Sequence, residues 1–262
     1  MKFLKSTMAA VLAVGMAFSL AACGSDNSAQ SNDGNTNEGK TYVIATDTTF
    51  APFEFENANG DFVGIDIDLM KAIAEDQGFN IEIQSLGFNA ALQAVTAGQA
   101  DGMIAGMSIT DERKEVFDFS EAYFDSGVVM AIGKNNNDIT SYEDLAGKKV
   151  AVKVGTEGET FAASIAEKYG FTTDVYDDSN SMYQAVLSGN AVACFEDYPV
   201  VGYAITQGIE LKLVTEKEQG SSYGFAVKKG SNPELIEMFN EGFANLKENG
   251  KYQEILDTYI QE

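Results

Sequence analysis

The stretch Gly106-Met107-Ser108-Ile109-Thr110-Asp111-Glu112-Arg113 contains residue types suited to binding a carboxylate. Residues 103–105 are apolar and predict a buried strand, and Thr110, followed by two acidic residues, is a suitable N-cap for a short helix. Free backbone amides at such a junction bind anions, and Arg113 adds a planar fork of donors that matches a carboxylate. The alternative is an ordinary turn with a solvated or ion-paired surface arginine, and these residues alone do not decide between the two.

The composition restricts the chemistry available to the chain. It has 262 residues, with Lys+Arg 17 against Asp+Glu 40, and a net charge of -23. Such an acidic surface disfavours binding to nucleic acid or to anionic membranes. The chain contains no histidine, which excludes imidazole-based catalytic triads, histidine metal sites and the usual proton shuttle at neutral pH. We therefore expect no metal and no cofactor.

The N-terminus has the layout of a bacterial lipoprotein signal. Lys2 and Lys5 form a basic start, residues 8–20 are apolar, and two alanines precede Cys23. The apolar run is shorter than the ~20 residues of a membrane span. Leu-Ala-Ala-Cys-Gly resembles a lipobox, which predicts a signal peptide over 1–22, lipidation of Cys23 and a lipid-anchored protein outside the cytoplasm. A conventional signal with a chance cysteine is the alternative.

Residues 24–40 contain no apolar side chain larger than alanine and cannot form a core. We therefore expect 23–40 to be the lipidated cysteine followed by a flexible tether. The second cysteine, Cys194, lies in an apolar run and is expected to be a buried core residue. With Cys23 lipidated it has no disulfide partner.

From Thr41 onward, strand-like and helix-like segments alternate, which is typical of an α/β protein. We expect a helix that starts at an Asp66 cap, and a helix over 90–97 just after Phe88. A strand over 149–154 leads to Gly155 and then a second helix. Thr156 at its N-terminus is suited to help bind a carboxylate, although Gly155 could equally be only a turn residue.

An internal repeat suggests two related halves. Residues 93–100 (Gln-Ala-Val-Thr-Ala-Gly-Gln-Ala) resemble residues 184–191 (Gln-Ala-Val-Leu-Ser-Gly-Asn-Ala), and each leads into a strand. The offset of 91 residues aligns Gly106 with Asp197. Ligands of α/β sheets bind beyond the carboxyl ends of strands, so a pocket between two lobes would use both ends. A chance match is the alternative, because helix, glycine and strand are a common order.

Five segments in order carry a family resemblance: 45–55 (ATDTTFAPFEF), 64–69 (GIDIDL), 106–113 (GMSITDER), 152–156 (VKVGT) and 223–224 (YG). They look like the polar amino acid-binding proteins of ABC importers, particularly the glutamine-binding type, over essentially all of 41–262. The resemblance implies a two-lobed Venus-flytrap α/β fold of the periplasmic-binding-protein type. Lobe one would be 41–126 plus 222–262 and lobe two 127–221, with two hinge crossings. It also implies a monomer that serves permease and ATPase subunits.

The resemblance implies a role for each matching residue. Arg113 should hold the α-carboxylate of an L-amino acid, assisted by Ser108 and Thr156, and Asp197 should pair with the α-ammonium. The Gly106 carbonyl would complete the ammonium site. Phe50 and Phe88 would cover the ligand's aliphatic stem, although a phenylalanine alone can equally be a core residue.

Specificity is left open at this stage. Asp47 and Lys153 match positions that address the ligand side chain in glutamine-binding relatives, and an acceptor beside a donor suits a carboxamide. Glu196 stands where a histidine is expected, and Glu157 stands where a glycine is expected. If both face the cleft, the side-chain pocket becomes more acidic, which disfavours glutamate or aspartate and leaves lysine, arginine or ornithine possible. We rank glutamine first, then a basic amino acid, and then another small polar one.

Two other classes of protein remain possible. A sensor of the same fold would bind the same ligand but signal to a receptor. An enzyme would need Glu196 or Glu157 as a general acid with a pKa raised by burial, and no histidine could assist it. We expect a binding protein rather than an enzyme.

Overall fold

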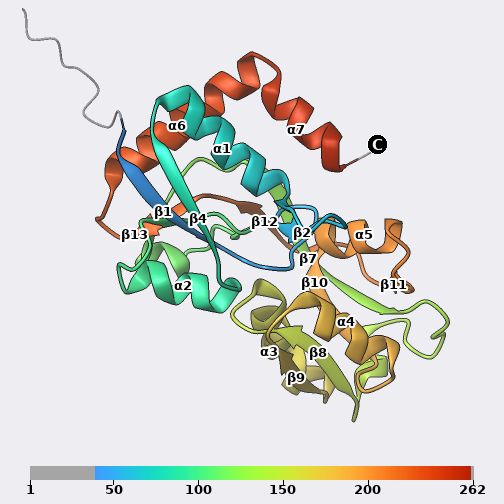
Figure 1. The fold of residues 1–262 in the computed structure, drawn as a ribbon. Helices are drawn as coiled ribbons and strands as arrows, with labels where there is room; N and C mark the ends of the chain where they lie inside the picture. Colours follow the sequence, from blue (N-terminus) through green and yellow to red (C-terminus); the bar gives the residue numbers. More distant parts are fainter. Residues whose placement is uncertain (1–38, 261–262) are drawn as a thin grey trace, which may run out of the picture. The chain divides into compact units, whose positions relative to one another are not determined.

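The computed structural model describes residues 39–260, which fold around two main β-sheets flanked by helices (Figure 1). The predicted signal peptide, Cys23 and most of the predicted tether lie outside the described residues. Among residues 39–260, no helix is both long enough and apolar enough to cross a membrane. Cys194 is buried with a free thiol, as expected.

The first sheet contains the interior strand β1 (Thr41–Thr46), whose side chains alternate between two hydrophobic layers. Its strand order is β4 (Asn80–Ser85), β1, β5 (Gly102–Met103), β13 (Ala226–Lys228) and β6 (Phe117–Phe119). Tyr42 and Ile44 pack in the layer of α1 (Ile65–Gln77), α6 (Pro233–Glu248) and α7 (Lys251–Tyr259), whereas Val43 and Ala45 pack in the layer of α2 (Phe88–Thr96). Because successive side chains of a strand point to opposite faces, this one strand anchors both layers.

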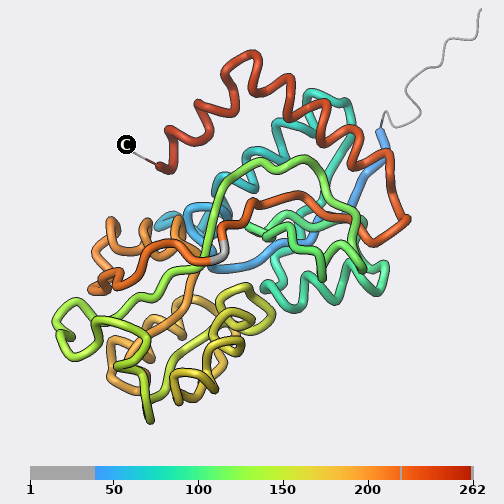
Figure 2. The backbone as a smooth tube through the Cα atoms, turned by 180° about the vertical axis from the view of Figure 1, so that it is seen from behind, coloured from blue at the N-terminus to red at the C-terminus, as the bar shows by residue number. Residues whose placement is uncertain are grey.

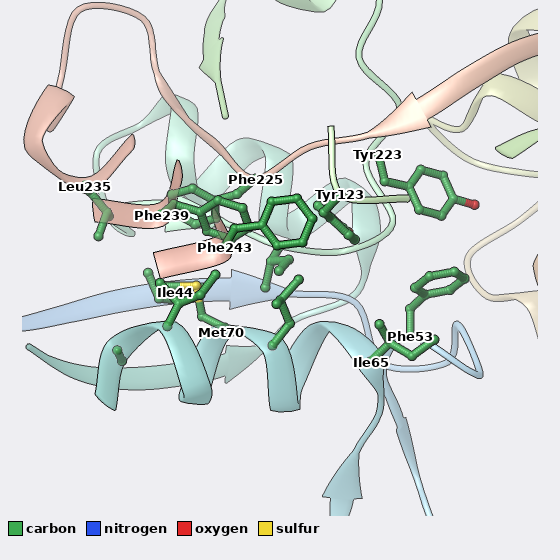
Figure 3. Packing of buried hydrophobic residues seen from close by; sticks show 14 of the residues in the cluster. Ile44, Phe53, Ile65, Met70, Tyr123, Tyr223, Phe225, Leu235, Phe239 and Phe243 are labelled. Atoms are coloured by element: carbon green, nitrogen blue, oxygen red, sulfur yellow. The ribbon is translucent and has the colours of Figure 1, made fainter. Parts of the chain in front are cut away.

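The layer under α1 and α6 is rich in aromatic rings (Figure 3). Phe225 stacks on Phe239 with 5.0 Å between the ring centroids, and Ile44 and Met70 belong to the same cluster. Burying such apolar surface provides about 25 cal/mol per Å² of driving force. This layer therefore holds α6, which lies near the C-terminus of the chain, on a sheet whose strands come mainly from residues 41–119.

The second sheet is also covered by helices on both faces, and its longest strand is β7 (Phe124–Gly133). Its order is β11 (Leu211–Leu213), β7, β10 (Ala193–Asp197), β8 (Lys149–Lys153) and β9 (Thr172–Tyr176), and β12 (Glu218–Tyr223) also pairs with β7. Val128 and Met130 pack in the layer of α3 (Glu157–Tyr169), and Val129 and Ala131 in the layer of α4 (Ser179–Leu187) and α5 (Tyr198–Thr206). The short elements are β2 (Phe55–Glu56), β3 (Phe62–Val63), and the 3₁₀ helices η1 (Arg113–Glu115) and η2 (Tyr142–Leu145).

The chain passes between the two sheets twice, from β6 to β7 and from β12 to β13. The two passages are hydrogen-bonded to each other: Ser120 N donates to Phe225 O at 2.8 Å, and Tyr123 N donates to Tyr223 O at 2.9 Å. Figure 2 shows them running side by side. The predicted two-lobed α/β fold with two crossings is confirmed, while the lobe boundaries at 126/127 and 221/222 stay a prediction.

Some local predictions differ from the structure. Asp66 does not cap α1: the helix begins at Ile65 with Gly64 as N-cap. Asp66 is fully buried, and its Oδ2 instead accepts hydrogen bonds from Gly106 N (2.7 Å) and Tyr123 OH (2.8 Å). The helix expected over 90–97 starts at Phe88 and includes it.

The helix expected after Thr110 is only a 3₁₀ turn, η1, with Glu112 as its N-cap residue. Thr110 still makes a capping contact, because its Oγ1 accepts a hydrogen bond from Arg113 N at 3.2 Å. A turn of three residues exposes few free amides in a row, so the anion-binding capacity of this junction depends mainly on the Arg113 side chain.

The internal sequence repeat occupies equivalent places in the two sheets. Residues 93–100 end α2 and lead to β5, and residues 184–191 end α4 and lead to β10. Gly98 and Gly189 both adopt positive φ angles, 72° and 79°, at the helix ends. β5 lies parallel to β1, and β10 lies parallel to β8. The repeat therefore places two chain segments at the carboxyl ends of corresponding parallel strands.

Gly158 marks a close approach between α3 and β10. A Cβ there would lie 2.7 Å from the carbonyl oxygen of Phe195, whereas a Cβ at Gly202 in α5 meets open space. Gly158→Ala should lower the free energy of unfolding by about 1–3 kcal/mol. Gly202→Ala should leave it unchanged or raise it by about 0.5–1 kcal/mol. Urea unfolding without ligand measures both, and equal effects would show that α3 can move away from the strand.

Candidate functional site

The candidate residues converge because they follow the carboxyl ends of parallel strands. Asp47 comes directly after β1, and Lys153 is the last residue of β8. Glu196 and Asp197 end β10, and Gly106 follows β5 by three residues. Since β1 and β5 belong to one sheet and β8 and β10 to the other, the site draws on both sheets.

Asp47 and Lys153 form an ion pair that joins the two sheets. The Lys153 Nζ donates to Asp47 Oδ2, and the side chains are 1% and 0% exposed. Asp47 Oδ1 accepts hydrogen bonds from Phe88 N at 3.0 Å and Thr48 N at 2.7 Å. Burial lowers the pKa of Lys153, but Asp47 and Glu196 outweigh burial and leave the pKa raised, so the lysine stays charged.

Arg113 is the only arginine in the chain, and it also reaches across to the second sheet. Its Nη1 donates to Ser108 O at 2.9 Å, and its Nη2 donates to Gly155 O at 3.1 Å. The same Nη2 lies 3.4 Å from Glu157 Oε1. Burial lowers the pKa of Arg113 and the Glu157 charge opposes this effect, so the guanidinium remains a cation.

Asp197 is buried and hydrogen-bonded to Tyr223, at the second chain crossing. Tyr223 OH donates to Asp197 Oδ2 at 2.6 Å and accepts from Ser126 Oγ at 2.9 Å. Burial, followed by the charge of Glu196, raises the pKa of Asp197 to about 7. Ser108 forms a β-bridge with Tyr223, and its Oγ lies 3.1 Å from Ser221 Oγ. Asp197 is thus a carboxylate that a ligand cation would help to ionise.

The Glu196 carboxylate accepts its hydrogen bonds from residues of α4 and β10, which belong to the second sheet and its helices. Its Oε2 accepts from Ser179 Oγ at 2.9 Å and Tyr183 OH at 3.3 Å, and its Oε1 accepts from Asp197 N at 3.0 Å. Burial raises the pKa of Glu196, although Lys153 and these hydrogen bonds oppose the rise. Glu196 therefore adds negative potential to the site while its own oxygens are bound by protein donors.

Two phenylalanines lie next to the cations. The Lys153 Nζ is 4.8 Å from the Phe50 ring centroid, and the Arg113 Cζ is 5.4 Å from the Phe88 ring centroid. Both rings are nearly fully buried, at 4% and 5% exposed. Gly106 has a positive φ of 51°, and a Cβ there would overlap the Phe50 ring. Glycine at 106 thus lets the Phe50 ring approach the backbone.

Thr156 is the N-cap of α3, as expected, but its hydroxyl is already engaged. The Oγ1 donates to Lys153 O at 2.7 Å and accepts from Glu159 N at 3.3 Å. Any help from Thr156 in binding an anion would therefore come from the helix N-terminus that it organises rather than from its hydroxyl.

Several side chains of the site were not expected from the sequence. Tyr223 bridges Asp197 and Ser126 in the hinge, and Asp66 holds the Gly106 amide. Glu54 is fully buried, and burial, followed by the charges of Asp66 and Asp47, raises its pKa well above the usual range. The signal in the sequence is that Glu54, Asp66 and Tyr223 lie within the motifs 45–55, 64–69 and 223–224.

Among residues 39–260, no group of three or more histidine, cysteine or acidic side chains is arranged to hold a metal ion. The site offers a largely buried arginine, a buried lysine, a carboxylate with a pKa of about 7 and two buried phenylalanine rings. A cavity of about 540 Å³ opens beside Arg113 and Glu157, and its lining includes neither Asp197 nor these two phenylalanines. Such a set suits a small zwitterion better than a purely cationic or anionic molecule.

Comparison with known proteins agrees with this fold. Residues 42–262 match the family model of bacterial extracellular solute-binding proteins, family 3. The chain is 31% identical over 257 residues to the arginine-binding extracellular protein ArtP of Bacillus subtilis, covering 96% of each chain.

Solved structures are similar as well. The substrate-binding domain 2 of Lactococcus lactis GlnP, in an open conformation, is 45% identical, with 87% of this chain and 98% of that one covered and a TM-score of 0.61. An ancestral arginine-binding protein bound to glutamine is 38% identical, with 85% and 98% covered and a TM-score of 0.79. The family match spans nearly all described residues, and the chain therefore belongs to the bacterial extracellular solute-binding proteins of family 3.

Proposed function

We propose that this protein captures a polar L-amino acid between its two lobes and delivers it to an ABC importer, with glutamine as the favoured ligand. The observation that carries the proposal is the presence of one largely buried cation, Arg113, and one buried acid, Asp197, so that each end of an amino acid has an oppositely charged partner. Arg113 would bind the α-carboxylate, and Asp197 the α-ammonium, with the Gly106 carbonyl and Ser108 beside it. Relatives described as amino acid-binding proteins support this ligand class.

Glutamine is favoured by the Asp47–Lys153 pair. A carboxamide has a carbonyl acceptor and an N–H₂ donor, and the pair offers Lys153 as donor and Asp47 as acceptor. A buried, charged Lys153 is unfavourable for a cationic ligand side chain. The ancestral relative bound to glutamine supports the same choice.

A basic amino acid is the second candidate, favoured by the charge of the site. Glu196 and Asp197 lie together on lobe two, while Asp47 already has Lys153 and Glu157 already has Arg113. A ligand with an extra positive charge would relieve the repulsion between Glu196 and Asp197. The similarity to ArtP, described as arginine-binding, supports this alternative.

The roles in the cell are part of the proposal: the family supports the place outside the cytoplasm and the transporter partners, and the sequence around Cys23 supports the lipid anchor. The protein would act outside the cytoplasm, anchored by lipidated Cys23 as a monomer, and would deliver its ligand to permease and ATPase subunits. A sensor role would use the same pocket with a receptor as partner. Release of the ligand chemically unchanged after incubation separates a binding protein from an enzyme.

Thermal melting against all amino acids tests the ligand class. A ligand present at a hundredfold over its dissociation constant should add about 2.7 kcal/mol of stability. We expect the largest rise with glutamine and a smaller one with arginine. A larger rise with arginine would favour the second candidate, and no rise with any amino acid would refute amino acid binding altogether.

A further inference from the structure

Glu157 lies opposite the Arg113 guanidinium, on the other lobe. It is the first residue of α3, which packs on the second sheet, whereas Arg113 follows β5 of the first sheet. Resting on the proposed function, we infer that Glu157 is an internal competitor of the ligand. In the unliganded protein its carboxylate occupies Arg113 in place of the ligand's α-carboxylate, and it lowers the affinity for every amino acid alike.

The hydrogen bonds of Arg113 support this inference. The guanidinium donates to Ser108 O and Gly155 O, and Glu157 Oε1 lies 3.4 Å from Nη2. The side chains of Arg113 and Glu157 are only 12% and 17% exposed, so water screens their attraction weakly. A ligand carboxylate that approaches Nη2 must therefore compete with the Glu157 carboxylate for the same cation.

The N-terminus of α3 shows what would remain for the ligand. Glu159 Oε2 accepts from Gly155 N at 2.6 Å, and Thr156 Oγ1 accepts from Glu159 N, so those amides are capped by side chains. The amides of Glu157 and Gly158 stand at the first two helical positions, where no intrahelical acceptor is available. An anion next to Arg113 can use them once the Glu157 carboxylate has moved.

The location of Glu157 separates this role from a role in side-chain recognition. Glu157 and Arg113 line the same 540 Å³ cavity, together with Thr110 and Thr160. The Asp47–Lys153 pair, which would bind the ligand side chain, does not line that cavity. Glu157 pairs with Arg113, and no ion pair among the described residues joins it to Lys153, so we place its effect at the α-carboxylate end rather than at the ligand side chain.

Glu157 weakens ligand binding in two ways. Its ion pair with Arg113 stabilises the unliganded protein, and a ligand carboxylate must disrupt this pair. Once a ligand is bound, two carboxylates near one guanidinium repel each other. Both effects weaken binding, and neither depends on the side chain of the ligand, which is why the loss should be uniform.

Isothermal titration calorimetry of the full chain with glutamine, arginine and histidine tests this inference. Glu157→Gln should bind every ligand of the wild type about three- to tenfold more tightly, because it removes an ion pair and a repulsion. The ratios between ligands should stay within about twofold. Glu112→Gln is the matched control: it removes the same charge at the rim of the same cavity, and no ion pair among the described residues includes Glu112.

Each outcome decides the question. Unchanged or weaker binding by Glu157→Gln overturns the inference while leaving amino acid binding intact. A changed ligand ranking also overturns it, because Glu157 would then act on the ligand side chain. Glu157→Ala gives a second comparison if the amide variant folds poorly, and melting without ligand verifies folding. A wild type that binds no amino acid overturns both the inference and the proposed function.

Discussion

Arg113→Ala is expected to weaken amino acid binding severely. The guanidinium is the only one in the chain, and it already spans from Ser108 O to Gly155 O across the two lobes. Removing one partner of a desolvated charge pair costs about 2–5 kcal/mol, which corresponds to a loss of roughly 30-fold to several thousandfold in affinity. Calorimetric titration with the best ligand of the thermal screen measures the loss.

Two further variants show whether the loss comes from the arginine fork. Lys114→Ala removes a neighbouring cation that is 53% exposed and pairs only with Asp111 among the described ion pairs, so it should change affinity less than twofold. Arg113→Lys keeps the charge but loses the planar fork, so it should bind with intermediate affinity. Binding by Arg113→Ala that matches the wild type would show that the carboxylate is held elsewhere.

The fold could be predicted because local patterns carry it. Residues 42–45 are all apolar, which is typical of a strand covered on both faces, and in the structure Tyr42 and Ile44 face one layer while Val43 and Ala45 face the other. Glycines at helix ends, such as Gly98, mark where helices stop. These signals depend on neighbours in sequence, so a single sequence contains them, and the repeat between 93–100 and 184–191 adds the two-lobed order.

The contacts around the site could not be predicted in the same way, because they join distant residues. Asp66 looks like a helix cap in the sequence, yet burial turns it toward Gly106 and Tyr123, 40 and 57 residues away. Tyr223 finds Ser126 at a separation of 97 residues. Nothing in the local sequence specifies such pairs, and the resemblance to a family predicts site residues without saying what those residues contact.

The ligand affinity should fall as the pH falls below 7, because Asp197 must be ionised to pair with an α-ammonium. Burial and Glu196 raise the pKa of Asp197 from 3.8 to about 7, while Tyr223 and Arg113 oppose the rise and Glu157 adds to it. At lower pH a proton competes with the ligand for this carboxylate. Affinity for glutamine should therefore decrease by up to about tenfold per pH unit between pH 7 and pH 5.

The stability of the unliganded protein should change in the opposite direction. A carboxyl group whose folded pKa lies above its unfolded value of 3.8 contributes stability that is fully present below 3.8 and is lost as the pH rises through about 7. The Asp197 contribution therefore makes the unliganded protein more stable at pH 5 than at pH 8, while ligand binding is weaker at pH 5. Urea unfolding and calorimetry over this pH range measure the two trends.

Asp197→Asn separates Asp197 from the other buried acids. The amide cannot ionise, so binding should be weak at every pH and its slope between pH 5 and pH 7 should disappear. Asp125→Asn is the control, since Asp125 is an exposed carboxylate that accepts a hydrogen bond from Ser222 beside the hinge, and it should keep the slope. Glu196→Gln removes the charge that raises the pKa of Asp197, so the fall in affinity should begin at a lower pH. A slope that survives in Asp197→Asn would assign the proton to another group, and Asp197 would then not be the ammonium site.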